Sequence, residues 1–79
     1  MRIDTDKIDD MVLALLHLNS FEFGDVVRAW KGHDWDALDR LHEKGMISNP
    51  RSKAKSVALS DAGAKRGIEL FEKYFTKPE

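Results

Sequence analysis

The pattern of hydrophobic and polar positions predicts a first helix over residues 3–19. Asp4 or Thr5 can cap its start, and further aspartates lie near its positive end. Residues 11–16 are all apolar, so hydrophobic side chains go all the way round a helix of about 3.6 residues per turn. Because an ordinary surface helix keeps one polar face, we expect this helix to be covered on more than one side.

The next segment gives a weaker pattern. Residues 21–23 alternate as in a short strand, and Gly24 interrupts them. Asp25 is a favourable N-cap, which predicts a short second helix over residues 26–31 that ends at a turn around Gly32.

The stretch DWDALDRLHEKGMI contains the clearest helix of the chain. Asp34 is a good N-cap, and Ala37, Leu38 and Leu41 form one inward stripe. Gly45 follows the last turn, where a residue in the left-handed conformation commonly closes a helix. We therefore predict a third helix between the cap and this glycine.

A β-hairpin and a last helix complete the pattern. Residues 46–48 can start one strand, the turn-forming Asn49-Pro50 follows, and residues 55–59 alternate as a second strand. Ser60 can cap a helix that runs to about residue 75. Two adjacent hydrophobic stripes follow this helix, formed by Ile68, Phe71 and Phe75 and by Leu70 and Tyr74.

The order helix, helix, turn, helix, hairpin, helix is typical of a winged helix-turn-helix domain. We therefore expect a mainly α (α+β) fold with a three-helix core, a short β-hairpin wing and a C-terminal helix. With 79 residues, the chain is expected to form a single domain over residues 1–79. A domain of this size buries only about 60% of the surface of its unfolded chain, so oligomerisation is an expected source of extra stability.

The segment RAWKGHDWDALDRLHEKGMISNPRSKAKSVALSDAG, residues 28–63, resembles a family of small uncharacterised bacterial proteins. The shared motifs are WKG-x-x-W, DRLHEKG, SKAKSV and a helix start of the S/T-D/E-x-G type. This resemblance implies a winged-helix fold and no particular activity. More distantly, LHEKGMI and VALSDAG are similar to the recognition-helix end, wing and last helix of MarR-like and PadR-like bacterial regulators, although the wing is shorter than a typical MarR wing.

Composition narrows the setting and the chemistry. The chain has no Cys, which excludes disulfides, thiolate metal sites and a cysteine nucleophile and fits a reducing compartment. Four aspartates precede the apolar run, whereas a secretion signal begins with a positive region. The apolar run of residues 11–16 is far short of the roughly 20 residues that a membrane span needs. We therefore expect a cytoplasmic protein without a membrane segment.

Nucleic-acid binding is one expectation, and it rests on a local group of cations. The formal net charge is −1 and the pI about 6.3, so no overall basic excess points to such a partner. The predicted wing, however, carries Arg51, Lys53 and Lys55 and no acid, and Arg28 and Lys31 can extend this patch. Such a wing can grip DNA phosphates without reading bases. Alternatively, its charges only keep a turn soluble and block edge pairing.

The outward face of the third predicted helix favours a protein partner over DNA. If its leucines face the core, Asp36, Asp39 and Glu43 face solvent together with Arg40. Three carboxylates would be repelled by DNA phosphates, and the major groove is read mainly by hydrogen-bond donors. We therefore expect this face to be solvated or to contact a protein.

No motif for catalysis, a metal or a cofactor is recognisable. The sequence shows no nucleophile–base pair, phosphate-cradling glycine loop or dinucleotide fingerprint, so we expect neither enzyme activity nor a cofactor. The spacing of His33, Asp34, Asp36 and His42 matches no metal site.

These observations predict a non-enzymatic binding module. One version is a small winged-helix transcriptional regulator or accessory DNA-binding protein that contacts phosphates through a basic wing, and the other is a winged-helix protein–protein interaction and dimerisation module without DNA binding. The surplus of apolar residues predicts a homodimer through the first and last helices, with Leu13, Leu70 and Tyr74 at the contact. Trp30 and Trp35 are either core residues or a partly exposed aromatic site for a ligand or partner.

Overall fold

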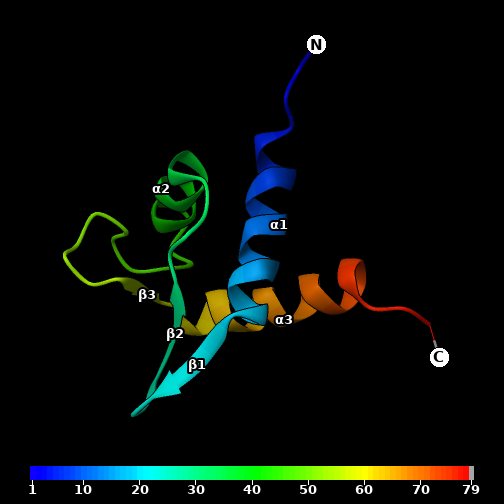
Figure 1. Cartoon of the computed structure of the whole chain (residues 1–79). Helices are drawn as coiled ribbons and strands as arrows, with labels where there is room; N and C mark the ends of the chain where they lie inside the picture. Colours follow the sequence, from blue (N-terminus) through cyan, green and yellow to red (C-terminus); the bar gives the residue numbers. More distant parts are fainter. Residues whose placement is uncertain (79) are drawn as a thin grey trace.

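The computed structural model describes residues 1–78, and its elements follow the order helix, strand, strand, helix, strand, helix. The strands form one antiparallel sheet in the order β1-β2-β3. In Figure 1, α1 lies beside the sheet, and α3 crosses α1 near the C-terminal end of α1. Both other helices therefore contact α1. The elements are α1 (Thr5–Leu18), β1 (Ser20–Phe23), β2 (Val26–Trp30), α2 (Trp35–Glu43), β3 (Ser56–Ala58) and α3 (Asp61–Phe75).

The predicted helix over residues 26–31 is wrong, because this segment forms strand β2. Its side chains alternate: Val27 and Ala29 pack against the core, and the residues between them face outward. Asp25 lies in the two-residue turn between β1 and β2 instead of capping a helix, and Gly24 beside it has a φ of +62°. Strands on both sides supply the backbone hydrogen bonds, whereas a helix this short is marginal on its own.

With β2 in place of a helix, the prediction of a winged helix-turn-helix fold is wrong. Such a domain joins two helices by a short turn and follows them with a hairpin. Here α2 comes directly after the β1–β2 hairpin, and the order within residues 1–78 is α, β, β, α, β, α. The fold is a small α+β arrangement of three helices and a three-stranded antiparallel sheet.

The predicted wing is replaced by a long loop. Residues 46–48 contact the end of β3 and the residues after it through an isolated bridge between Ile47 and Leu59. Backbone hydrogen bonds from Ser48 to Ala58 and from Ser60 to Met46 accompany this bridge, while β3 itself pairs with β2. Residues 48–55, here called the connecting loop, contain turn-forming and charged residues but no large hydrophobic side chain that could hold a second strand against the core. The basic residues expected on a wing therefore lie on this loop, at the edge of the sheet.

Three of the four predicted helix N-caps are confirmed. The side chains of Asp4, Asp34 and Ser60 each accept a hydrogen bond of 3.0 Å from a backbone N–H in the first turn of α1, α2 and α3. Gly45 follows α2 with a φ of +78°, in the left-handed region that glycine adopts without strain. These residues supply partners for backbone groups that a helix end leaves unsatisfied, so the helix boundaries follow the sequence closely.

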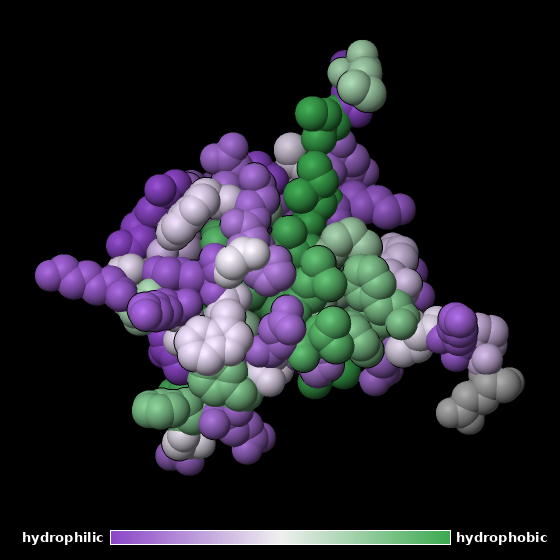
Figure 2. All heavy atoms as spheres, in the orientation of Figure 1, coloured by the Kyte–Doolittle hydropathy of each residue, from purple (hydrophilic) through white to green (hydrophobic). Residues whose placement is uncertain are grey.

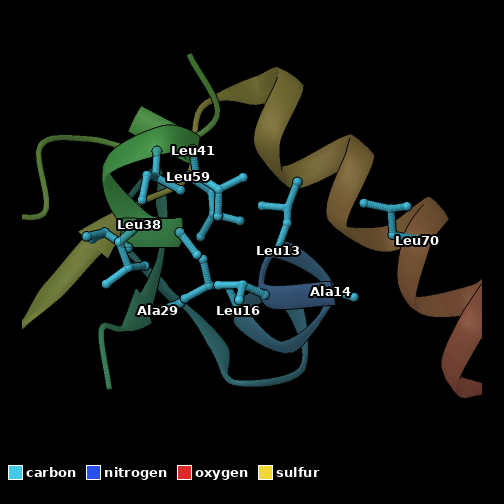
Figure 3. Packing of buried hydrophobic residues seen from close by; sticks show 12 residues of the cluster. Leu13, Ala14, Leu16, Ala29, Leu38, Leu41, Leu59 and Leu70 are labelled. Carbon is cyan, nitrogen blue, oxygen red and sulfur yellow. The ribbon is translucent and has the colours of Figure 1, made fainter. Parts of the chain in front are cut away.

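The core lies where α1 meets α2, the sheet and α3. Leu38 and Leu41 of α2 are buried, as predicted. Figure 3 shows both on the side of α2 that faces Leu16 of α1, with Leu13 directed between α1 and α3. Only 1% of Leu13 and 1% of Leu70 is exposed, so these two side chains are part of the core between α1 and α3.

Two glycines allow α3 to pack closely. A Cβ atom added at Gly63 would overlap the Met46 carbonyl oxygen, and one added at Gly67 would lie 3.2 Å from the Cβ atom of His17 on α1. From sequence alone these glycines only weaken the helix, by about 1 kcal/mol each relative to alanine. In the fold, Gly63 allows α3 to approach the backbone at Met46, and Gly67 allows α3 to approach α1.

Candidate contact surfaces

Three of the five cations expected to contact nucleic acid are bound by other residues of the chain, and the first two are Arg28 and Lys31. Arg28 Nε and Nη2 donate to the hydroxyl and carbonyl oxygens of Ser56, at 2.8 and 2.9 Å. Lys31 Nζ donates to the carbonyl oxygens of Pro50 and Ser52, at 2.7 and 2.8 Å. Arg28 therefore joins β2 to β3, and Lys31 ties the connecting loop to the end of β2.

Arg51 is held by two residues of α2. Its Nη2 and Nε atoms donate to the two carboxylate oxygens of Asp39, at 2.6 and 3.1 Å, and its guanidinium carbon lies 4.8 Å from the centre of the Trp35 ring. The hydrogen bond from Arg51 lowers the pKa of Asp39, and the same bond raises the pKa of Arg51. Water screens this exposed pair, so its main effect is to order the connecting loop rather than to stabilise the fold.

Lys53 and Lys55 differ from the other three cations. Both side chains are exposed, and the ion pairs among residues 1–78 include neither of them. Lys55 directly precedes Ser56, which lies opposite Trp30 in the sheet. The structure thus leaves two exposed ammonium groups on the connecting loop, which leads into the strand β3.

The outward face of α2 is less acidic than the sequence predicts. Asp36 and Glu43 are exposed as expected, but Asp39 is paired with Arg51. Arg40, expected to face solvent, instead turns to α1 and binds Asp9. Within residues 1–78, two of the three expected carboxylates are therefore left without a cation on this face.

A buried carboxylate that was not predicted from the sequence lies between α1 and α2. Asp9 is fully buried, and its oxygens accept hydrogen bonds from Arg40 Nε at 2.9 Å and from Lys44 Nζ at 2.9 Å. Burial alone raises the pKa of Asp9, but the bonds from Arg40 and Lys44 outweigh it and hold this pKa below its ordinary value. The bonds to Asp9 in turn raise the pKa values of Arg40 and Lys44.

Helical spacing could have identified this carboxylate. Asp9 precedes Leu13 by four residues and Leu16 by seven, so all three share the inward face of α1. An acid on such a face needs a cation, and the two basic residues nearest in space come from α2. The three residues Asp9, Arg40 and Lys44 link α1 to α2, and each charge has a partner of opposite sign. We therefore interpret the cluster as a structural contact.

A continuous apolar surface extends over α1 and the C-terminal half of α3. Figure 2 shows it as a band of hydrophobic side chains along α1 that continues over this end of α3. Leu18 is 58% exposed and Phe75 43% exposed. The surface, here called the α1–α3 face, consists of Ile8, Met11, Leu15, Leu18, Tyr74 and Phe75.

Of the three residues expected at a dimer contact, two are buried beneath this surface and one is exposed on it. Leu13 and Leu70 lie beneath it in the core, because they fill the space between the two helices. Tyr74 is exposed, and the ammonium groups of Lys7 and Lys73 lie 5.6 and 5.1 Å from its ring centre. The exposed apolar residues of α1 therefore do not include Leu13, the residue of this helix that was predicted at the dimer contact.

The outward face of the sheet carries a second group of exposed hydrophobic residues. The Phe21 and Trp30 rings lie 5.0 Å apart with an interplanar angle of 36°. Phe23 is 71% exposed and Trp30 57% exposed, so of the two alternatives for Trp30 the core position does not apply and an exposed aromatic residue remains. This surface, here called the aromatic sheet face, consists of Phe21, Phe23, Val26, Arg28 and Trp30, which alternate with inward-facing residues along β1 and β2.

Further features of residues 1–78 concern pockets, metal ligands and membrane segments. An open pocket of about 350 Å³ lies between the β1–β2 hairpin and α3, with Glu22 and His17 among its lining residues. Burial lowers the pKa of His33. No cluster of three or more metal-ligating side chains occurs among these residues. Among them, too, no helix has both the length and the hydrophobicity that a membrane crossing requires.

Comparisons with known proteins identify a family for the chain but no activity. Residues 4–77 match the profile of a family described as "Domain of unknown function (DUF6429)". The "Uncharacterized protein y4hR" of Sinorhizobium fredii (strain NBRC 101917 / NGR234) is 52% identical over 77 residues, which cover 98% of this chain and the whole of the relative. No solved structure matches. The resemblance to a family of uncharacterised proteins is confirmed, and the similarity to MarR-like and PadR-like regulators finds no support.

Proposed function

The chain belongs to the DUF6429 family, and we propose that it is a binding module that pairs with a second copy of itself through the α1–α3 face. The observation that carries this proposal is the continuous apolar surface on two adjacent helices. On α1, Ile8, Met11, Leu15 and Leu18 follow the spacing of one helix face, apart from the inward side chains that form the core. A contiguous apolar surface of this kind usually marks an interface.

The charge distribution of α1 supports a second copy as the occupant. The acids of this helix and its cap, Asp4, Asp6, Asp9 and Asp10, all lie at its N-terminal end, and residues 11–18 contain none. A two-fold axis across the middle of α1 would pack the two helices antiparallel. That arrangement keeps the two acidic ends apart and aligns the helix dipoles favourably, and it uses the same apolar side chains on both subunits.

Sedimentation equilibrium at micromolar concentration tests the pairing. We expect a species of twice the chain mass of 9.0 kDa. Ile8→Asp places a charge on the α1–α3 face at a position that is 38% exposed, so it should shift the equilibrium to monomer without unfolding the chain. A well-folded monomer for the unmodified chain would overturn the proposal.

Val26→Asp is the matched control. Val26 is an aliphatic residue of similar exposure, 41%, but it lies on the sheet, away from α1 and α3. This variant should remain a dimer. Dissociation by Val26→Asp, with Ile8→Asp still dimeric, would place the contact on the sheet instead.

A further inference from the structure

The aromatic sheet face has the composition of a surface on which nucleic-acid bases stack. Phe21 and Phe23 lie on β1 and Trp30 on the neighbouring β2, so three rings are spread over two adjacent strands. The exposed fractions of Phe23 and Trp30, 71% and 57%, show that no helix covers them. Aromatic rings on an open antiparallel sheet bind unpaired bases by stacking, largely independently of base identity.

Arg28 supplies an ordered cation in the middle of this face. It lies opposite Phe21 in the sheet, and two of its N–H groups are used by Ser56. These two bonds fix the position of the guanidinium group beside Ser56, and its other N–H groups remain as donors. A guanidinium group fixed beside aromatic rings can bind a phosphate or stack on a base.

Two lysines add positive charge at the edge of the sheet, on the loop that leads into β3. Lys53 and Lys55 are exposed on the connecting loop, which Lys31 anchors at Pro50 and Ser52. The β2–β3 register places Lys55 one residue from the partner of Trp30. No acid lies among the outward-facing side chains of β1, β2 and β3, and Asp25 is in the turn at the opposite end.

We propose that the aromatic sheet face binds single-stranded nucleic acid, with bases stacked on Phe21, Phe23 and Trp30 and phosphates held by Arg28, Lys53 and Lys55. An unpaired strand suits the flat face better than a duplex does, because the bases of a duplex are already stacked on each other. A polyanion suits its edge better than an apolar protein surface does, because that edge carries cations and no acid. The proposal is independent of pairing through the α1–α3 face.

Fluorescence anisotropy with a labelled single-stranded oligothymidylate of 12 nucleotides tests this proposal, with a duplex of equal length as the comparison. We expect the single strand to bind more tightly than the duplex at low salt. Phe23→Ala removes one exposed ring and should weaken binding about 10-fold or more, since each stacked base contributes on the order of 1–3 kcal/mol. Trp30→Phe should retain most of the affinity that Trp30→Ala loses.

Phe75→Ala is the matched control, because Phe75 is an exposed phenylalanine of the α1–α3 face. It should leave the affinity for the single strand unchanged. Lys53→Ala and Lys55→Ala should each lower the slope of log affinity against log salt by about 0.7, the value for one phosphate contact on a single strand. No binding of the single strand at low salt, equal binding of the duplex, or equal losses in Phe23→Ala and Phe75→Ala would overturn the proposal.

Discussion

The three helices supply most of the buried core, whereas the β1–β2 hairpin exposes two of its aromatic side chains. The helices turn Leu13, Leu38 and Leu70 into the core, where 1% or less of each is exposed. The hairpin turns Phe23 and Trp30 outward, because only one face of the sheet is covered by helices. Stability should therefore reside mainly in the helix contacts, and the hairpin should tolerate changes that leave its backbone intact.

The largest expected effect is at the contact between α3 and the segment after α2. Gly63→Ala places a methyl group onto the Met46 carbonyl oxygen, and backbone atoms cannot move aside easily. We expect a loss of about 3 kcal/mol or more in the free energy of unfolding, measured by urea denaturation followed by circular dichroism. Gly67→Ala, whose nearest neighbour is a side-chain carbon at 3.2 Å, should cost less. A more stable Gly63→Ala chain would contradict this packing.

The next effect concerns the ionic contact between α1 and α2. Asp9→Asn removes the carboxylate that binds Arg40 and leaves Lys44 with Asp6 alone, and because both cations are partly exposed we expect a loss of about 2–3 kcal/mol. Asp10→Asn is the control, since Asp10 has only a long ion pair of 3.9 Å with Arg66. Equal stability of the two variants would contradict a role for the buried carboxylate.

The same carboxylate predicts a pH dependence. Its pKa is lower in the folded chain than in the unfolded chain, where an aspartate has a value of about 3.9. The stability it provides is therefore fully present above about pH 4 and is lost as the pH falls through the folded pKa. Thermal unfolding between pH 3 and pH 7 should show a smaller acid loss for Asp9→Asn than for the unmodified chain. Parallel curves would indicate that Asp9 is not the titrating group.

A smaller effect is expected in the hairpin turn. Gly24→Ala forces an alanine to a φ of +62°, which costs roughly 1–2 kcal/mol. Gly32→Ala is a matched control, because an added Cβ there meets open space and its φ is not positive. The control should be neutral or slightly stabilising, and a neutral Gly24→Ala would mean that the turn has another conformation.

The smallest effect is expected on the aromatic sheet face. Phe23→Ala should change the free energy of unfolding by less than about 0.5 kcal/mol, because most of the ring is exposed. Leu70→Ala should cost about 2–5 kcal/mol, since it leaves a cavity between α1 and α3. Similar costs for these two substitutions would remove the contrast between the hairpin and the helices.

The same contrast explains which parts of the fold could be predicted from the sequence. α2 has a cap, a hydrophobic stripe and a closing glycine, and these local signals agree with its packing. β2 has a favourable cap residue and two adjacent valines, and its conformation depends on pairing with β1 across a two-residue turn and with β3 from a distant part of the chain. Local signals could not decide between a helix and a strand there, and this error led to the wrong fold.

In the candidate sites, too, the contacts of single residues depend on how distant parts of the chain pack together. The exposed Lys53 and Lys55 follow from a loop rich in polar residues, but the pairing of Arg51 with Asp39 depends on how that loop folds back on α2. Likewise, Leu13 is equivalent to Leu15 in hydrophobicity, and only the position of α3 determines which of them is buried.

The most direct test of the proposed pairing uses the absence of cysteine from the chain. A two-fold axis midway along the apolar positions of α1 places Ile8 of one copy opposite Leu18 of the other. Mixing the Ile8→Cys and Leu18→Cys variants under mild oxidation should give mainly the mixed disulfide-linked dimer, and far less product when either variant is mixed with Val26→Cys. Equal cross-linking in all mixtures, or none in any, would contradict antiparallel pairing through the α1–α3 face.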